Sequence, residues 1–155
     1  MIREAGPDDI DDLIELERGA FKGDRISRRS FRHLLAGARG RVFVAVEDGV
    51  IVAYAVVLFR ASSATARLYS VAVLPRQRRS GIGRGLVERA ERAAVEAGCA
   101  RMRLEIREDN DASSRFFERL GYRAFGRWDE YYDDRMSALR YEKHLAESKE
   151  APGSA

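Results

Sequence analysis

The chain has 155 residues, a formal net charge of +3 and a pI of about 9.2, with 45% hydrophobic and 34% charged residues. This length fits one domain that buries about two-thirds of the surface its unfolded chain exposes, so it folds without a disulfide or metal. The single cysteine, Cys99, excludes an internal disulfide and a cysteine-based zinc site. We expect Cys99 to be buried as a small apolar residue.

We expect a cytoplasmic protein that binds neither membranes nor nucleic acid. The start, residues 1–4, lacks the apolar region of a secretory signal, and no apolar run approaches the ~20 residues of a membrane span. The small net charge mildly favours anionic partners without requiring nucleic acid. Residues 1–145 are expected to form one domain, and residues 146–155 a flexible tail because they are small, polar and contain Pro and Gly.

The first part of the chain predicts one short strand and two helices. Residues 1–5 alternate like a strand, and Pro7 opens a helical pattern. The apolar residues of this pattern recur at helical spacing: Ile10, Leu13, Ile14 and Leu16. Residues 27–38 predict a second helix that is capped by Ser27. The charged stretch 18–26 between the helices, which contains two glycines, is predicted to be a loop.

The middle of the chain changes to strand patterns. Residues 41–47 and 50–59 are rich in β-branched and apolar residues, and Asp48–Gly49 between them is typical of a hairpin turn. A further strand is predicted over residues 67–74, which end at Pro75. Three consecutive strands followed by a helix indicate an antiparallel meander that enters a βαβ unit.

The last part predicts two helices and three strands. Residues 82–97 form a clear amphipathic pattern that Gly98 ends, and residues 101–107 follow as a strand. A short helix is predicted to begin at Asn110 or Asp111 and to run through Leu120. Two strands, 122–132 and 136–144, complete the sheet.

The connection between strand 67–74 and the next helix, residues 75–84, has the features of an anion site. Backbone N–H groups in a glycine-bearing turn point inward, and the helix start adds about half a positive charge. Gly81 and Gly83 allow close approach to a phosphate group. Four arginines add positive charge: Arg76, Arg78, Arg79 and Arg84. Alternatively, these glycines only permit packing in an ordinary β–α connection.

Two common nucleotide motifs do not fit this connection. A P-loop ends in Gly-Lys-Ser/Thr, which is absent here. A dinucleotide fingerprint needs a third glycine where this chain has Leu86, and it follows its strand directly. The turn predicts a phosphate ligand of another kind.

At these residues the chain resembles the GNAT superfamily of N-acetyltransferases, most nearly the ribosomal-protein alanine and other protein N-terminal acetyltransferases. The segment Arg78-x-x-Gly81-x-Gly83 is similar to the acetyl-CoA motif of that family. The resemblance covers residues 2 to 145. Further matching segments are Leu68–Val73, Leu104–Arg107, Asn110, Glu118–Tyr122 and Tyr131-Tyr132-x-Asp134.

The resemblance implies an α/β domain with a mixed, mostly antiparallel sheet of six to seven strands, flanked by about four helices and splayed between strands 4 and 5. The pantetheine arm of acetyl-CoA would enter the gap and bind the backbone at Val71, Ala72 and Val73. Asn110 would approach the thioester, but it fits a helix cap equally well. The other implied cofactor contacts are Arg78, Arg79, Ser80, Gly81, Ile82, Gly83, Arg84 and Phe117. No metal is expected.

The chemistry that the resemblance implies is direct attack by a neutral amine on the thioester carbonyl. A protonated amine has no lone pair, so a base or a water relay must remove a proton. Glu105 matches the family's general-base position, and strand alternation places it opposite the core-facing Leu104 and Ile106. Its alternative is a surface carboxylate. Tyr131 is a second candidate catalytic residue.

The chain departs from the family at Phe117, where many members carry the tyrosine proposed to protonate the departing thiolate. Phenylalanine has no proton to donate, which leaves three explanations. The thiolate leaves unprotonated or takes a proton from water, another tyrosine such as Tyr131 or Tyr132 substitutes, or the activity is reduced. We favour the first.

The acceptor is expected to be a primary amine, on a protein N-terminus or on a small molecule. Residues 18–31 and 128–134 would form its walls, with Phe21 and Tyr131 against its apolar part. The acids there could attract an amine, or they form only a solvated hairpin tip: Asp129, Glu130, Asp133 and Asp134. A weakly active acyl-CoA-binding module and an arginine-turn nucleic-acid binder are the other hypotheses. A monomer or a homodimer is expected, and no catalytic role is assigned to His33 or His144.

Overall fold

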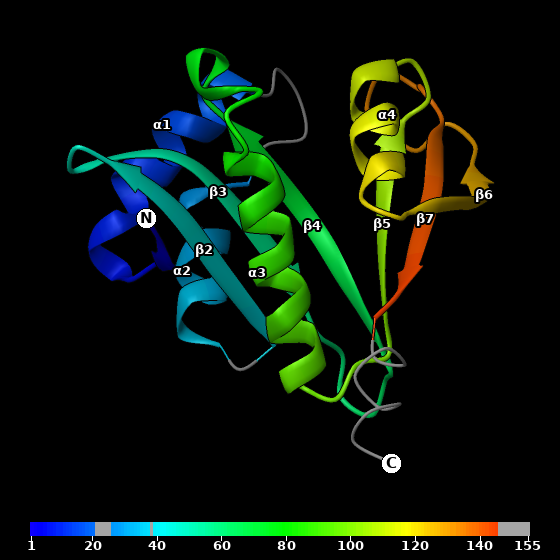
Figure 1. Cartoon of the computed structure of the whole chain (residues 1–155), viewed down its shortest axis with the longest axis horizontal. Helices are drawn as coiled ribbons and strands as arrows, with labels where there is room; N and C mark the ends of the chain where they lie inside the picture. Colours follow the sequence, from blue (N-terminus) through cyan, green and yellow to red (C-terminus); the bar gives the residue numbers. More distant parts are fainter. Residues whose placement is uncertain (21–25, 38, 146–155) are drawn as a thin grey trace.

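A seven-stranded sheet with strand order β1-β2-β3-β4-β5-β7-β6 forms the centre of the molecule (Figure 1). The computed structural model describes residues 1–20, 26–37 and 39–145. The strands are β1 (Ile2–Glu4), β2 (Gly40–Glu47), β3 (Val50–Leu58), β4 (Thr65–Val73), β5 (Arg101–Arg107), β6 (Arg123–Trp128) and β7 (Ala138–His144). The helices are α1 (Ile10–Ala20), α2 (Arg28–Ala36), α3 (Ile82–Glu96) and α4 (Asp111–Arg119), with short 3₁₀ turns at Pro7–Asp9 and Pro75–Gln77.

The first half of the sheet is the predicted antiparallel meander. Strands β1 to β4 pair with their neighbours in chain order, all antiparallel. Asp48 and Gly49 join β2 to β3 with φ of 52° and 77°. Two consecutive positive φ values are those of a type I′ hairpin turn, so the prediction from Asp-Gly is confirmed.

The second half begins with β4 and β5, the only parallel pair among the described strands, which α3 connects. Three residues of each strand are paired, Thr65–Arg67 with Arg101–Arg103. Beyond Arg67 and Arg103 the two strands diverge. Figure 1 shows β5 running toward α4 and β4 running away from it. The predicted splay between the fourth and fifth strands is therefore confirmed.

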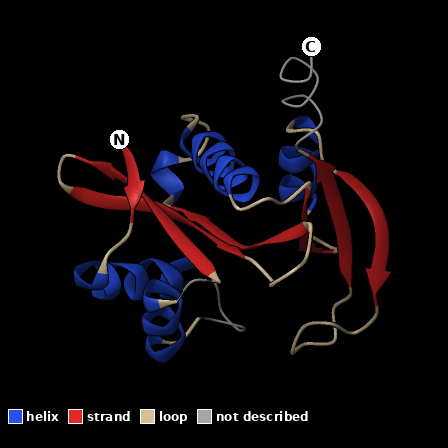
Figure 2. Ribbon diagram, turned by 90° about the horizontal axis from the view of Figure 1, so that it is seen from below, coloured by secondary structure: helices blue, strands red, loops and turns tan. Residues whose placement is uncertain are grey.

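Two apolar clusters lie on opposite faces of the sheet. One joins α3 and α4 to strands from both halves and includes Leu86, Met102 and Phe117. The other is built from α1, α2 and strands β2 to β4, and includes Leu13 and Tyr54. In Figure 2, helices therefore cover both faces of the first half, whereas only one face of β5, β7 and β6 carries a helix. Cys99 is 3% exposed, as expected.

Several predicted boundaries change in the structure. The loop predicted over residues 18–26 is wrong at its start, because α1 continues through Ala20 and the charged residues Glu15 and Arg18 fit its exposed face. Strand β6 ends at Trp128 rather than at residue 132, since the chain turns at Glu130, whose φ is 46°. The side chain of Ser27 caps α2 as predicted. Phe21 and the predicted tail lie outside the described residues.

No helix in the described part of the chain is both long and apolar enough to cross a bilayer. Within the same residues, no three His, Cys, Asp or Glu side chains gather in a way that suits a metal ion.

Candidate active site

The turn that precedes α3 presents unbonded backbone N–H groups at a helix N-terminus. Arg79 and Gly81 have φ of 67° and 90°, which fold the chain sharply before the helix begins. The first backbone bond into the helix is Gly85 N–H to Gly81 O, so the N–H groups of Gly83 and Arg84 have no backbone acceptor among the described residues. The first turn carries no acidic side chain. This arrangement suits a phosphate group.

The two glycines of the turn differ in backbone conformation and in their surroundings. A Cβ at Gly81 would meet nothing within 4 Å, so its φ of 90° and not packing explains this glycine. A Cβ at Gly83 would lie 3.4 Å from Phe116 of α4 and 3.6 Å from Val73 of β4. Both are ordinary van der Waals distances, so packing requires a glycine at neither position.

The arginines of the turn remain partly available to a ligand. Arg78 donates from Nε to the backbone oxygen of Val73 at 3.3 Å, which folds its side chain back onto the end of β4. Arg84 pairs with Glu88 one helical turn later at 3.1 Å. Arg76 and Arg79 form no ion pair with any residue that the structure describes. Ser80 turns its hydroxyl inward to the backbone oxygen of Gln77.

The open edge of β4 exposes main-chain groups to the splay. Leu74 N–H donates to Val52 O of β3 at 2.9 Å. Because N–H groups alternate along a strand, those of Val71 and Val73 point the other way, toward the side where β5 has diverged. Ala72 between them directs its amide to β3 and its buried side chain into the core. An extended ligand could pair with Val71 and Val73 as an added strand.

Glu105 lies where β4 and β5 separate. Its neighbours Leu104 and Ile106 are buried in the core, so alternation directs Glu105 to the opposite face, as predicted. Its side chain is only 7% exposed, and its Oε1 accepts a hydrogen bond from Arg67 Nε at 2.8 Å and forms an ion pair with Arg67 Nη2 at 2.6 Å. Among the described residues, Glu105 Oε2 has no hydrogen-bond partner.

Arg67 joins the two candidate catalytic residues. It is the last residue of β4 that pairs with β5, and its Nη2 also donates to the Tyr131 hydroxyl at 2.6 Å. Burial lowers the pKa of Arg67, but the negative charge of Glu105 and the bond to Tyr131 outweigh it, so the pKa is raised. Arg67 is therefore a fixed cation that holds a carboxylate and a phenol together.

The sequence reasoning missed Arg67. The sequence pattern around Arg67 is weak evidence for a functional residue, because a single arginine at the start of a strand matches no motif. Pairing of residues 65–67 with 101–103 is a long-range contact that local patterns do not report.

Asn110 is the N-cap of α4, since its Oδ1 accepts from Ser113 N at 3.1 Å. The cap alternative is thus confirmed, and Asn110 is exposed. Phe117 is 8% exposed and packs edge-to-face on Phe116 and Tyr122, at centroid distances of 4.9 and 5.5 Å. Its cofactor role stays a prediction.

The tyrosine nearest Phe117 cannot supply the missing acid. Tyr122 is 1% exposed, and its hydroxyl donates to Glu91 of α3 at 2.7 Å. Burial and the Glu91 carboxylate raise the pKa of Tyr122 well above its usual range. Tyr131 remains the tyrosine whose hydroxyl reaches Glu105, through Arg67.

The acidic residues near Tyr131 are largely engaged locally. Asp134 pairs with Arg107 at 2.8 Å, and Asp129 pairs with Arg127 at 2.9 Å. The Arg107 guanidinium and the Met136 N–H hold the pKa of Asp134 below its usual value. These pairs order the loop between β6 and β7 and support the solvated-tip alternative for both aspartates.

Comparison with known proteins agrees with this geometry. A sequence profile described as "Acetyltransferase (GNAT) family" matches residues 9–122. The chain is 31% identical over 144 residues to an uncharacterized N-acetyltransferase, MJ1530, from Methanocaldococcus jannaschii, covering 90% of this chain and 88% of that protein.

Two crystal structures are close in fold. The Escherichia coli ribosomal-protein-S18-alanine N-acetyltransferase has a TM-score of 0.82 at 26% identity, covering 94% of this chain and 93% of that one. Ard1 from Thermoplasma volcanium has a TM-score of 0.83 at 25% identity, covering 94% and 97%.

The splayed sheet and the profile match define an acyltransferase. The chain belongs to the acetyltransferase (GNAT) family.

Proposed function

We propose that the protein transfers an acetyl group from acetyl-CoA to the N-terminal amine of a protein or peptide. The observation that carries this proposal is one continuous path of binding groups. It runs from the unbonded amides at the start of α3, along the open edge of Val71 and Val73, to Glu105 at the point of divergence. The path ends at a carboxylate, which can accept the proton that the attacking amine must lose.

The residues present fit the donor. The amides of residues 79–84 and the unpaired Arg79 would hold the pyrophosphate at the N-terminus of α3. Val71 and Val73 would pair with the pantetheine amides. The bound thioester supplies an activated acetyl group, and the protein supplies position and proton transfer.

Glu105 takes the proton from the attacking amine, directly or through one water. Arg67 binds Oε1, which leaves Oε2 to accept the proton. Because Arg67 also binds the Tyr131 hydroxyl, it fixes the tyrosine at the mouth of the site, where 40% of Tyr131 is exposed. The tyrosine then orients the acceptor amine.

Phe117→Tyr decides how the thiolate leaves. We expect less than about a threefold change in kcat, since a thiol with a pKa near about 8.5 departs without an acid. An increase above tenfold would instead show that a proton donor is missing. Thiol release by wild type and variant is the measurement, with Phe116→Tyr as the control because Phe116 is the adjacent ring.

The peptide acceptor rests on similarity to a ribosomal-protein alanine acetyltransferase and to Ard1. The rival acceptor is a small-molecule amine. A screen with acetyl-CoA, N-terminal peptides, polyamines, amino acids and a DNA oligonucleotide, with mass detection of the product, tests the proposal. Acetylated peptide N-termini are expected. Acetylation of polyamines alone would refute the peptide acceptor, and tight acetyl-CoA binding without turnover would indicate a binding module.

A further inference from the structure

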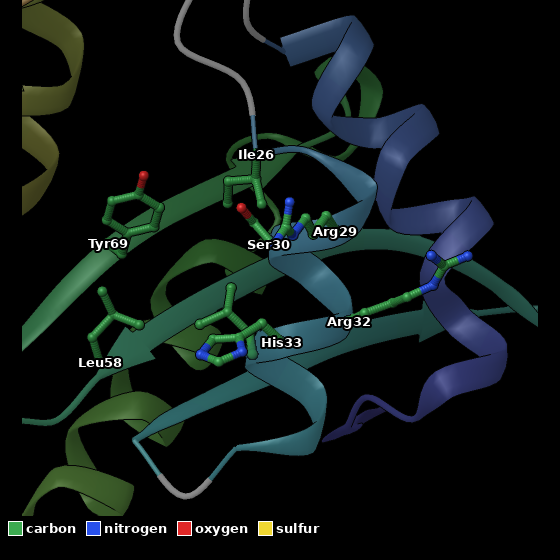
Figure 3. Close-up of a pocket in the computed structure, with 8 residues that line it drawn as sticks. Ile26, Arg29, Ser30, Arg32, His33, Leu58 and Tyr69 are labelled. Atoms are coloured by element: carbon green, nitrogen blue, oxygen red, sulfur yellow. The ribbon is translucent and has the colours of Figure 1, made fainter.

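A second depression lies beside the reaction centre, between α2 and the strands β3 and β4 (Figure 3). Its volume is about 730 Å³, within the range of ligand sites. The residues that line it are Ile26, Arg29, Ser30, Arg32, His33, Leu34, Leu58 and Tyr69. In Figure 3 one side of α2 faces Tyr69 and Leu58, whereas Arg32 extends toward α1. We call this depression the α2 pocket.

The α2 pocket is cationic because its helix carries no acid. Residues 26–46 contain five arginines and no Asp or Glu. Arg28 is neutralised by Asp11 at 2.8 Å, but Arg29 and His33 form no ion pair with any described residue. The floor is apolar, since Ile26 is buried and Leu34 and Leu58 are half-buried. Such a surface suits a ligand with carboxylates and short apolar parts.

Tyr69 connects this pocket to the proposed base. It is the extra residue of a β-bulge, because Leu68 pairs with Val57 and Ser70 with Val56. The bulge turns the Tyr69 ring outward, where it is 47% exposed. Arg67 lies 5.3 Å from the centre of this ring and also binds Glu105. Arg67 thus links Tyr69, in the wall of the α2 pocket, to Glu105 in the proposed reaction centre.

We propose that the α2 pocket selects acceptor peptides with Asp or Glu at their second to fourth residues. This inference rests on the proposed function. An extended peptide advances about 3.3 Å per residue, so with its amine at Glu105 those residues reach past Tyr69. Arg29 and His33 would attract their carboxylates, and Leu34 and Leu58 would contact the stems of their side chains. The positive charge of Arg29 would repel a basic peptide.

The test compares peptides that share one N-terminal residue and carry acidic, neutral or basic residues at positions two to four. We expect kcat/KM for the acidic peptide to exceed that for the basic peptide by at least about tenfold, and less so at high salt. Arg29→Glu should reduce this ratio to about one or below. Arg92→Glu is the matched control: it makes the same charge change on α3, on the other face of the sheet, and should leave the ratio unchanged.

A direct measurement of peptide binding tests the pocket proposal separately from the proposed function. The labelled acidic peptide should bind wild type more tightly than the basic one, and Arg29→Glu should abolish this difference. Equal kcat/KM for both peptides, with acetylation intact, would overturn the pocket and leave the function standing. If no peptide is acetylated, the function fails, and the binding difference still decides the pocket. A DNA oligonucleotide is the last probe. If it binds wild type more tightly than the acidic peptide does, and if Arg29→Glu abolishes this binding, the pocket proposal is overturned in favour of a nucleic-acid site.

Discussion

The two halves of the sheet are built for different tasks. Strands β1 to β4 have helices on both faces, and residues such as Val44, Tyr54 and Ala55 are completely buried. Strands β5, β7 and β6 carry a helix on one face, and every residue of β6 before Trp128 is exposed. The halves are joined by three residue pairs between β4 and β5.

The difference shows where charge is tolerated. The open face of the second half holds ion pairs such as Arg67–Glu105 and Arg103–Glu142, which a doubly covered strand could not accommodate at little cost. In the proposed reaction, the covered half would supply rigidity and the donor-side backbone. The open half would supply the carboxylate and access for the acceptor.

The largest expected effect concerns stability in the covered half. Leu86 of α3 is 0% exposed, so Leu86→Ala should lower the free energy of unfolding by about 2–5 kcal/mol. Phe125→Ala on β6, where 40% of the ring is exposed, should cost less than about 1 kcal/mol. Urea denaturation measures both. Equal losses would mean that the two halves contribute alike.

Next comes chemistry in the open half. Glu105→Gln keeps the shape of the side chain but removes the base, so kcat/KM should fall by about 10²-fold or more. Thiol release across pH is the measurement. Glu142→Gln, on the neighbouring strand and paired with Arg103, is the control and should stay near wild type. If Glu105→Gln preserves both the rate and its pH profile, Glu105 is not the base.

Arg67→Met should have a smaller effect on the same chemistry. The variant leaves Glu105 and Tyr131 in place but frees both, so kcat should fall by about tenfold. The KM for acetyl-CoA should be unchanged, so the loss should be confined to kcat. Arg103→Met is the matched control. A raised KM for acetyl-CoA with an unchanged kcat would contradict this positioning role.

The smallest effect is local and depends on pH. The pKa of Asp134 is lowered from 3.8 mainly by its bond to Arg107, so this ion pair stabilises the loop above pH 3.8 and is lost as the pH falls through the lowered pKa. NMR titration should place the Asp134 midpoint below 3.8, and closer to 3.8 in Arg107→Gln, where the Met136 N–H still lowers the pKa. The Met136 amide, which donates to Asp134, should report the same change. Identical midpoints in both proteins would contradict the assignment.

Much of the fold followed from local patterns, because each pattern had a local cause. Asp48–Gly49 specified its turn through positive φ, and the apolar spacing of residues 82–97 specified α3. The predicted ends of helices and strands were wrong where the sequence pattern fitted both a loop and a helix or strand. The charges and the two glycines of residues 18–26 suggested a loop, but tertiary packing of Leu13 and Leu16 stabilises α1, which continues through Ala20.

The sequence by itself determined the strand order of the meander, the sharp turn at Gly81 before α3, and the face on which Glu105 lies. These depend on φ preference and on the two-residue period of a strand, which are properties of neighbouring residues. Only the tertiary structure decided that Arg67 holds Glu105 and Tyr131, and that Tyr69 opens the α2 pocket beside them. Those contacts join residues 38 and 64 positions apart, through a three-pair junction and a β-bulge that no local pattern encodes.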